Sequence, residues 1–233
     1  MSRRRRARSS SWAARLLPLQ ADVRSIGAVR DAVNRAEAEF NGLGIVVAQA
    51  KIDPLQGTPS LQAWSDGVDV DVDLIGSIDV IQAALPHLEG ASVIATASTA
   101  AIMQHGIADT PDSDPGGAGY AYAKRALAKC MHELVCNRAS LKERVAASHP
   151  TNCNTQMLRS EPTHRSFRPD LEPSTRQDTG STFVRQAMPI PFVELVAISN
   201  MALFLTFGEA RHIAGVRLRM DSGGCLKRYD RQH

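Results

Sequence analysis

The sequence predicts an α/β fold built on a doubly wound parallel sheet. Two observations lead to this prediction. Short apolar runs of the kind found in buried parallel strands alternate with longer stretches whose apolar residues have helical spacing. The chain has 233 residues, of which 43% are hydrophobic, so it can bury a sizeable core. No run of about eighteen apolar residues occurs, and a membrane-spanning helix is therefore not predicted.

A short strand and a helix are predicted first. Leu16–Val23 has the composition of a short apolar strand. In residues 25–40 the apolar side chains recur every three or four positions, which places them on one face of a helix. Ser25 is positioned to cap the beginning of this helix, and Asn41-Gly42 is typical of its end.

The next strand and helix follow in residues 44–85. Residues 44–48 form a continuous apolar run, which is typical of a buried parallel strand. The stretch from Leu61 to Ile78 is ambiguous, because Val68–Asp73 alternates like a strand while the longer stretch has helical spacing. We predict a helix, since a helix accounts for more of these residues than a short strand does.

The second half of the chain continues the alternation. In chain order we predict a strand at 92–97, a helix at about 120–141, a strand at 144–148, a helix at about 193–207 and a final strand at 215–220. Residues 104–119 are rich in Gly, Pro and Asp and are predicted as a loop. Residues 150–190 have no clear period, and a loop of that length usually covers a binding site or is disordered.

The positive charge of the chain is concentrated in its first twenty residues, which hold six arginines and no acidic residue. The formal net charge of the whole chain is +3. Without these six arginines the chain has 21 basic and 24 acidic residues, so the rest of it is slightly acidic. The basic balance therefore belongs to a tail, and we predict neither a nucleic-acid-binding domain nor a membrane partner. Residues 1–15 are predicted as a disordered, arginine-rich tail, with a weak polyanion-binding arm as an alternative.

The cysteines and histidines do not indicate a metal site. Four cysteines, scattered at 130, 136, 153 and 225, are too few for a disulfide framework, and no Cys-x-x-Cys pair occurs. The seven histidines share no ligand spacing, so no metal is predicted. We expect free thiols and a cytoplasmic location.

Three residues are candidates for proton-transfer chemistry. Ser98 follows the strand at 92–97, and ligands of such sheets lie outside the carboxyl ends of the strands. Tyr120 and Lys124 are four residues apart and therefore share one face of a helix. A phenol has a pKa near 10 and needs a nearby cation before its phenolate can act as a base. A tyrosine and a lysine at this spacing also occur on many exposed helices, so the pair alone is weak.

Several segments, in the same order, resemble the short-chain dehydrogenase/reductase family from about Leu17 to Lys227. They are Ala21-Asp22-Val23, Ile45–Ala48, Ser98, Tyr120 with Lys124, His149–Thr155 and Gly215–Gly224. The resemblance implies a Rossmann-like fold and an NAD(P)-dependent oxidoreductase that transfers a hydride between a nicotinamide cofactor and an alcohol or carbonyl substrate.

A narrower resemblance points to the branch of the family that is coupled to the redox carrier mycofactocin. It depends on three segments, at residues 148–157, 167–172 and 209–227. In that branch the cofactor is NAD, held without exchange and reoxidised by the external carrier, although NADP is not excluded here. Family members usually form tetramers through their long central helices and last strand, which implies a homotetramer.

The resemblance also implies a role for each matching residue. Tyr120 would be the general acid/base, Ser98 would orient the reacting oxygen, and Lys124 would lower the tyrosine pKa and bind the nicotinamide ribose. Asp22 would accept from the adenine amino group beside the Val23 backbone. Further cofactor contacts would come from Gln49, Ala50, Pro150, Thr151, Cys153 and Thr155. His149, beside the site, is interpreted as a structural residue.

The sequence departs from the family at Asp73. The family motif Asn-Leu-Thr-Gly reads Asp73-Leu74-Ile75-Gly76 here. The family asparagine helps to hold a water that relays protons to the lysine. A carboxylate in its place would still accept hydrogen bonds and would favour the charged form of Lys124, so Asp73 is a further candidate catalytic residue. The family's Asn-Ala-Gly likewise becomes Gln49-Ala50-Lys51, which puts a long side chain where a glycine approaches the cofactor.

The largest departure precedes Asp22, where the family's glycine-rich turn and the acidic residue of its second strand are missing. Residues 16–233 are therefore predicted as a truncated domain with a substrate lid at about 156–190 and an exposed sheet edge at Ile45–Ala48. Either the true start lies upstream or the chain is a decayed paralogue. Two alternatives to the enzyme stay open: a non-catalytic remnant that pairs with an intact paralogue, and a nucleic-acid or membrane-surface binder that acts through the tail.

Overall fold

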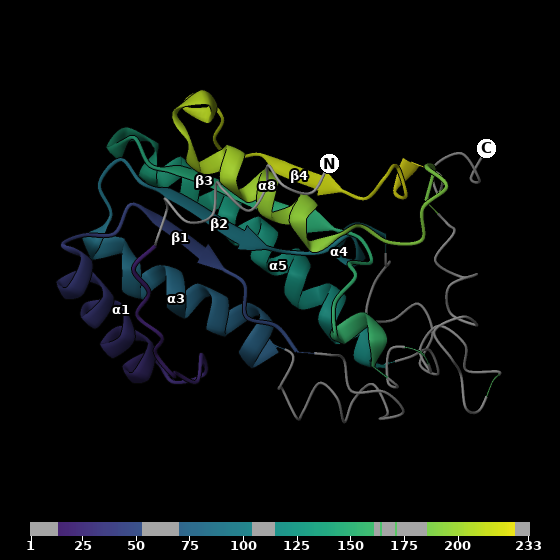
Figure 1. Cartoon of the computed structure of the whole chain (residues 1–233), viewed down its shortest axis with the longest axis horizontal. Coiled ribbons are helices and arrows are strands. Elements are labelled where there is room, and N and C mark those ends of the chain that lie inside the picture. The colour runs from purple at the N-terminus through teal and green to yellow at the C-terminus, as the bar shows by residue number, and fades with distance from the viewer. Residues whose placement is uncertain are drawn as a thin grey trace, which may run out of the picture.

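Four parallel strands form one sheet at the centre of the fold (Figure 1). The computed structural model describes residues 14–52, 70–103, 115–160, 164, 171 and 186–226. The strands lie in the order β1 (Ile45–Ala48), β2 (Ser92–Thr96), β3 (Arg144–Pro150) and β4 (Arg217–Met220). Each pairs in parallel with its neighbour, which confirms these four predicted strands.

Helices cover both faces of this sheet. Helices α1 (Ile26–Phe40), α3 (Ser77–Ala84) and α5 (Pro115–Arg138) lie on one face, and α8 (Leu195–Thr206) lies on the other (Figure 1). Successive side chains of a strand point to opposite faces, so Val93 packs in the cluster with α5 while Ile94 packs with α8. Burial on both faces explains the continuous apolar runs and confirms the doubly wound α/β prediction. No helix among the described residues is long and apolar enough to cross a membrane.

The prediction of a strand at Leu16–Val23 is wrong, because residues 14–22 belong to no strand. A strand needs a neighbour that pairs with its backbone groups, and this segment has none in the described sheet. Its side chains still alternate between exposed and half-buried up to Val23. A turn then leads into α1, where the Ser25 hydroxyl accepts from the Ala28 N–H at 3.3 Å, as the predicted cap requires.

Strand β1 is an edge of the described sheet, since it pairs only with β2. Val46 and Ala48 are buried toward α3 and α5, whereas Ile45 is 51% exposed and Val47 is 44% exposed. The exposed edge predicted at Ile45–Ala48 is therefore present in the described structure.

The ambiguous stretch before residue 85 is helical where the structure describes it. A π-helix, η1 (Val70–Gly76), leads directly into α3, which confirms the helix prediction for residues 70–78. Residues 61–69 lie outside the described residues. Helix α5 begins at Pro115 rather than at about residue 120, because proline, which has no N–H, is favoured in the first turn of a helix. The rest of the predicted loop, residues 104–114, lies outside the described residues. The short helix α4 (Ala100–Met103) precedes it.

The predicted tail and lid lie mostly outside the described residues, which exclude 1–13, 161–163, 165–170 and 172–185. At the edge of the tail, Arg15 forms an ion pair with Glu39, and its guanidinium lies 5.4 Å from the centroid of the Phe40 ring. Within the lid range, Met157–Arg159 form the short 3-10 helix η4. The boundaries of the tail and of the lid stay predictions.

Candidate active site

The carboxyl ends of β1, β2 and β3 bring the predicted site segments to one edge of the sheet. The register pairs Ala48 with Ala95 and Thr96 with Ser148, so the residues that follow each strand emerge at the same edge. Gln49, Ser98 and Thr151 are those residues or their near neighbours. Ligands of doubly wound sheets bind at this edge, which makes it the candidate active site.

A buried ion pair lies beside this edge. Lys124 Nζ on α5 is 3.6 Å from Asp73 Oδ1 on η1, and their side chains are 1% and 0% exposed. The backbone N–H of Ile52 also donates to Asp73 Oδ1, at 3.1 Å. Asp73 Oδ2 is buried and has no hydrogen-bond partner among the described residues. The π-helix thus places the Asp73 carboxylate next to Lys124. The two residues are far apart in the sequence, so their spacing alone does not predict this contact.

Burial acts on both members of the pair. Loss of water raises the pKa of Asp73 and lowers the pKa of Lys124. Each charge opposes the effect on its partner, because the ammonium lowers the pKa of the carboxyl and the carboxylate raises the pKa of the ammonium. A third group, Lys51, lowers both pKa values through its positive charge. Lys51 is half-buried in the segment that follows β1.

Tyr120 and Lys124 lie together on α5, as their spacing predicts. Lys124 Nζ is 5.7 Å from the centroid of the Tyr120 ring, within the range of a cation–π interaction. Tyr120 is half-buried, whereas Tyr122 on the same helix is 38% exposed. The tyrosine therefore lies next to a lysine that is itself removed from water.

Ser98 stands at the turn between β2 and α4. It is half-buried, and its Oγ accepts from the Ala100 N–H at 3.1 Å. Because Oγ acts as an acceptor there, its own hydrogen stays available for another acceptor. The Ser98 carbonyl accepts from the His149 ring, with Nδ1 at 2.8 Å.

Asp22 lies in the turn before α1, with its carboxylate held by Arg24. The guanidinium donates to both carboxylate oxygens at 2.6–3.1 Å, and the Arg24 N–H donates to Oδ1 at 3.0 Å. These contacts lower the pKa of Asp22 to about 2. Val23 packs closely against Gly76. A Cβ added to Gly76 would lie 2.6 Å from Val23 Cγ2. This contact joins the Asp22 turn to the helix that carries Asp73.

The remaining predicted cofactor residues line the ends of β1 and β3. The Thr96 hydroxyl donates to Gln49, and Ala50 follows half-buried. Pro150 is buried, and its carbonyl accepts from the Thr99 N–H at 3.0 Å, while the Thr151 N–H donates to the Met220 carbonyl at 3.0 Å.

Cys153 and Thr155 lie in the half-buried segment that follows β3. Burial raises the pKa of the Cys153 thiol, and the charge of Lys51 opposes that change. The Thr155 hydroxyl accepts from the Leu158 N–H of η4 at 3.4 Å. The positive charge of Lys51 thus acts in the same direction on the pKa values of Asp73, Lys124 and Cys153, lowering all three.

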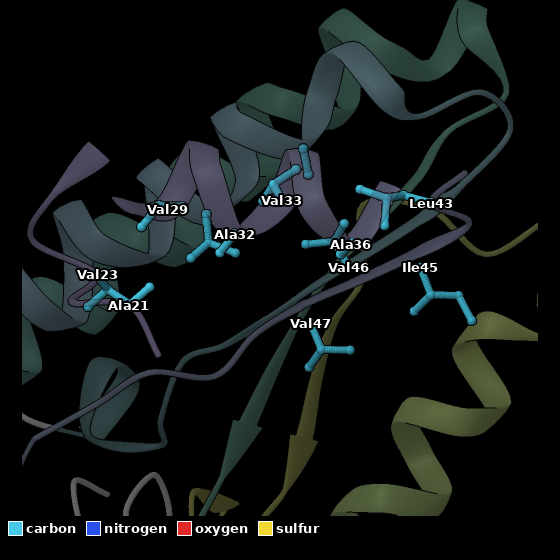
Figure 2. A pocket seen from close by; sticks show the side chains of 12 residues that line it. Ala21, Val23, Val29, Ala32, Val33, Ala36, Leu43, Ile45, Val46 and Val47 are labelled. Atoms are coloured by element: carbon cyan, nitrogen blue, oxygen red, sulfur yellow. The ribbon is translucent and has the colours of Figure 1, made fainter. Parts of the chain in front are cut away.

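A separate cavity of about 310 Å³ opens between α1 and the edge strand β1 (Figure 2). Aliphatic side chains line it throughout, including Val29 and Val33 of α1 and Ile45 and Val47 of β1. None of the proton-transfer candidates lines it, and of the predicted cofactor residues only Val23 does. We refer to it below as the α1/β1 groove.

The family follows from comparison with known proteins. A family model described as short chain dehydrogenase matches residues 4–166. The chain belongs to the short-chain dehydrogenase/reductase family. It is 34% identical over 220 residues to a (-)-trans-carveol dehydrogenase from Rhodococcus erythropolis, a match that covers 90% of this chain and 74% of the relative.

Solved structures share the fold of this chain. The carveol dehydrogenase from Mycobacterium avium in complex with NAD superposes with a TM-score of 0.81 at 29% identity, covering 91% of this chain and 76% of that one. A short chain dehydrogenase from Burkholderia cenocepacia in complex with NADP gives a TM-score of 0.69 at 26% identity and covers 88% and 75%. Family membership confirms the predicted class, an oxidoreductase that uses a nicotinamide cofactor.

The sequence predicts Tyr120, Lys124 and Ser98 as site residues, with Asp73 as a departure from the family motif. It gives no signal for the Ile52 N–H that binds Asp73, because the two residues are far apart in the chain. For Lys51 it indicates only a bulky substitution, although the charge of Lys51 lowers the pKa values of Asp73, Lys124 and Cys153. The contact between Arg24 and Asp22 was not predicted. The signal that could have indicated it is the two-residue spacing, which favours a local side-chain to backbone hydrogen bond.

Proposed function

We propose that this chain is an alcohol dehydrogenase or carbonyl reductase that uses NAD, with Tyr120 as the general acid/base. The observation that carries the proposal is the buried Lys124, which lies over the Tyr120 ring and pairs with Asp73 at the ligand-binding edge of the sheet. A cation removed from water stabilises a neighbouring phenolate far more strongly than an exposed one does. The proposed substrate is a small secondary alcohol or its ketone, since the chain resembles two proteins named carveol dehydrogenase.

The residues at the sheet edge fit a nicotinamide cofactor in their chemistry. Lys51 and Lys124 offer two ammonium groups to phosphate and ribose oxygens, and Thr151 and Thr155 offer hydroxyls. Asp22, Val23, Gln49, Ala50, Pro150 and Cys153 complete the proposed contact set. Bound at this edge, the nicotinamide ring supplies hydride transfer to or from the carbinol carbon.

The proton moves through Tyr120 in this proposal. When the alcohol is oxidised, its hydroxyl proton passes to the Tyr120 phenolate, and when the carbonyl is reduced the phenol returns it. The Ser98 hydroxyl, whose Oγ already accepts from Ala100, donates to the substrate oxygen and orients it. Lys124 keeps the phenolate accessible at neutral pH, and Asp73 keeps Lys124 charged in its buried position.

Three further parts of the proposal come from the sequence. By the narrower resemblance, the enzyme would keep its NAD bound between turnovers and would depend on mycofactocin as the external carrier. By the wider family resemblance, the active form would be a homotetramer that associates through α5 and β4. The free cysteines favour a cytoplasmic location.

Replacement of Tyr120 tests the proposed function. Purified protein, mixed with a panel of secondary alcohols that includes carveol, should reduce an artificial electron-acceptor dye. The Tyr120→Phe variant should lose about 100-fold or more of this rate, since it removes the acid/base group. The matched control is Tyr122→Phe, a more exposed tyrosine on the same helix, which should keep the rate. Nicotinamide released on denaturation should be found in both variants.

Three results would contradict the proposal. Full activity in Tyr120→Phe would remove the tyrosine from the mechanism. Wild-type protein that carries no nucleotide and is inert toward the whole panel would favour the non-catalytic remnant instead. Salt-sensitive nucleic-acid binding that survives Tyr120→Phe but not removal of residues 1–12 would favour the tail-mediated binder.

A further inference from the structure

His149 is fully enclosed at the carboxyl end of β3, directly beside the end of β2. Its side chain is 1% exposed, and Nδ1 lies 2.8 Å from the carbonyl oxygen of Ser98. A carbonyl oxygen only accepts hydrogen bonds, so Nδ1 must carry the hydrogen. The ring therefore links the two strand ends through a residue proposed to orient the substrate.

The surroundings of His149 favour a neutral ring. Burial lowers the pKa of His149, and the positive charges of Arg217 and Arg219 on β4 lower it further, while the bond to Ser98 opposes them. Nε2 is buried and has no hydrogen-bond partner among the described residues, so a second proton there would have no acceptor. The Nδ1–H tautomer is consequently fixed, and its one hydrogen bond goes to Ser98.

The backbone explains why a side chain is needed at this point. Beyond the paired residues, the Ala97 N–H donates to the Ser148 carbonyl at 2.8 Å and the Thr99 N–H donates to the Pro150 carbonyl at 3.0 Å. Proline has no N–H, so β3 cannot donate a backbone hydrogen bond to the Ala97 carbonyl, which lies between these two amides. The His149 ring adds a side-chain donor next to this gap and binds the carbonyl of Ser98, the following residue.

We propose that His149 is a positioning residue that fixes Ser98 for the reaction, an inference that rests on the proposed function. Four contacts hold the serine. Its carbonyl accepts from the His149 ring at 2.8 Å and from the Ala101 N–H at 3.2 Å, the next amide donates to Pro150, and its Oγ accepts from the Ala100 N–H. Without the His149 contact the Ser98 carbonyl loses the shorter of its two hydrogen bonds, so the turn that carries the hydroxyl is held less firmly. His149 touches neither the substrate nor the proton in this scheme, and it acts only through Ser98.

Two substitutions separate a positioning role from a merely structural one. His149→Leu keeps an apolar volume but removes the donor, and it should lower kcat by about 10- to 100-fold, as a small misplacement of a reacting group does. His149→Asn places an amide donor near the position of Nδ1 and should restore most of kcat. Both variants should keep the bound nicotinamide and the wild-type circular dichroism spectrum, which shows that the fold is intact.

A double-mutant cycle provides the decisive measurement. If His149 acts through Ser98, His149→Leu should cost little further activity in a Ser98→Ala background. An additional 10-fold loss in that background would overturn the proposal, as would equal activities of the Leu and Asn variants.

Amide hydrogen exchange at Thr99 and Ala100 tests the contact without any turnover. It should speed up in His149→Leu and return toward the wild-type rate in His149→Asn. Unchanged exchange in His149→Leu would overturn the positioning role. Because this readout needs no activity, a wild-type protein that proves inert would contradict the proposed function while His149 is still tested.

Discussion

Asp73 is a buried acid paired with the buried Lys124, at a position where the sequence resemblance implies a neutral asparagine. A neutral amide would leave Lys124 to carry an uncompensated charge in a buried position, whereas the carboxylate at 3.6 Å compensates it. The Ile52 N–H stabilises the charged form of the carboxyl and opposes the effect of burial on its pKa. Asp73 and Lys124 therefore titrate as a pair, and the pH dependence of the reaction should report that pair.

We expect Asp73→Asn to narrow the pH range of activity from the alkaline side. The carboxylate raises the pKa of Lys124, so its loss lowers that pKa further and the ammonium disappears at lower pH. The fall of kcat/KM at high pH should begin earlier, with a loss on the order of tenfold at the alkaline end. At acid pH, once Asp73 of the wild type is itself protonated, the two enzymes should converge.

The matched control for this substitution is Asp71→Asn. Asp71 is an exposed acid in the same π-helix, and its substitution should leave the pH profile unchanged. Superimposable alkaline limbs for wild type and Asp73→Asn would show that the carboxylate has no influence on the lysine.

At the scale of the element, the π-helix η1 depends on a close contact. Gly76 has no side chain, and a Cβ there would meet Val23 Cγ2 at 2.6 Å and Val23 Cβ at 2.9 Å. Such distances require one of the two segments to shift. Because η1 carries Asp73 and Val23 follows Asp22, the contact couples the proton-transfer side of the site to the turn proposed to bind adenine.

We expect Gly76→Ala to destabilise the protein by about 1–3 kcal/mol, the usual cost of an overpacked contact. Gly27→Ala in α1 is the control, because a Cβ at Gly27 meets nothing within 4 Å. Urea denaturation followed by circular dichroism gives both free energies of unfolding. A stability of Gly76→Ala equal to that of the wild type would mean that the two segments separate without cost.

The elements differ in how far the sequence alone predicts them. The helix at Ile26–Phe40 and strands β1 to β4 follow from local periodicity, and the serine cap was visible in the sequence. The strand at Leu16–Val23 was not predictable in the same way, since a strand exists only if a distant segment pairs with it. The site divides similarly. Tyr120 and Lys124 meet through helical spacing, whereas Asp73 reaches Lys124 through a fold-dependent contact between η1 and α5.

At the scale of the whole molecule, the described sheet has an unprotected apolar edge. The exposed Ile45 and Val47 of β1 present an edge that can pair with another chain, since no Lys or Pro interrupts the strand. We expect Val47→Lys to slow the aggregation of the protein at least several-fold, because a charge on an edge strand opposes strand addition.

Light scattering during incubation at elevated temperature measures this rate. Leu203→Lys, which adds the same charge on the exposed surface of α8, is the control and should have a smaller effect. Equal protection by both variants would point to net charge rather than to the edge strand.

The α1/β1 groove has a practical consequence for anyone who handles this protein. The α1/β1 groove is open and lined by aliphatic side chains, so the environment-sensitive dyes that are used to follow melting can bind to the folded protein. Fluorescence would then be high before any unfolding begins, and a weak melting transition would be mistaken for a molten or misfolded sample. Far-ultraviolet circular dichroism reads the helices directly and is the sounder monitor for this chain.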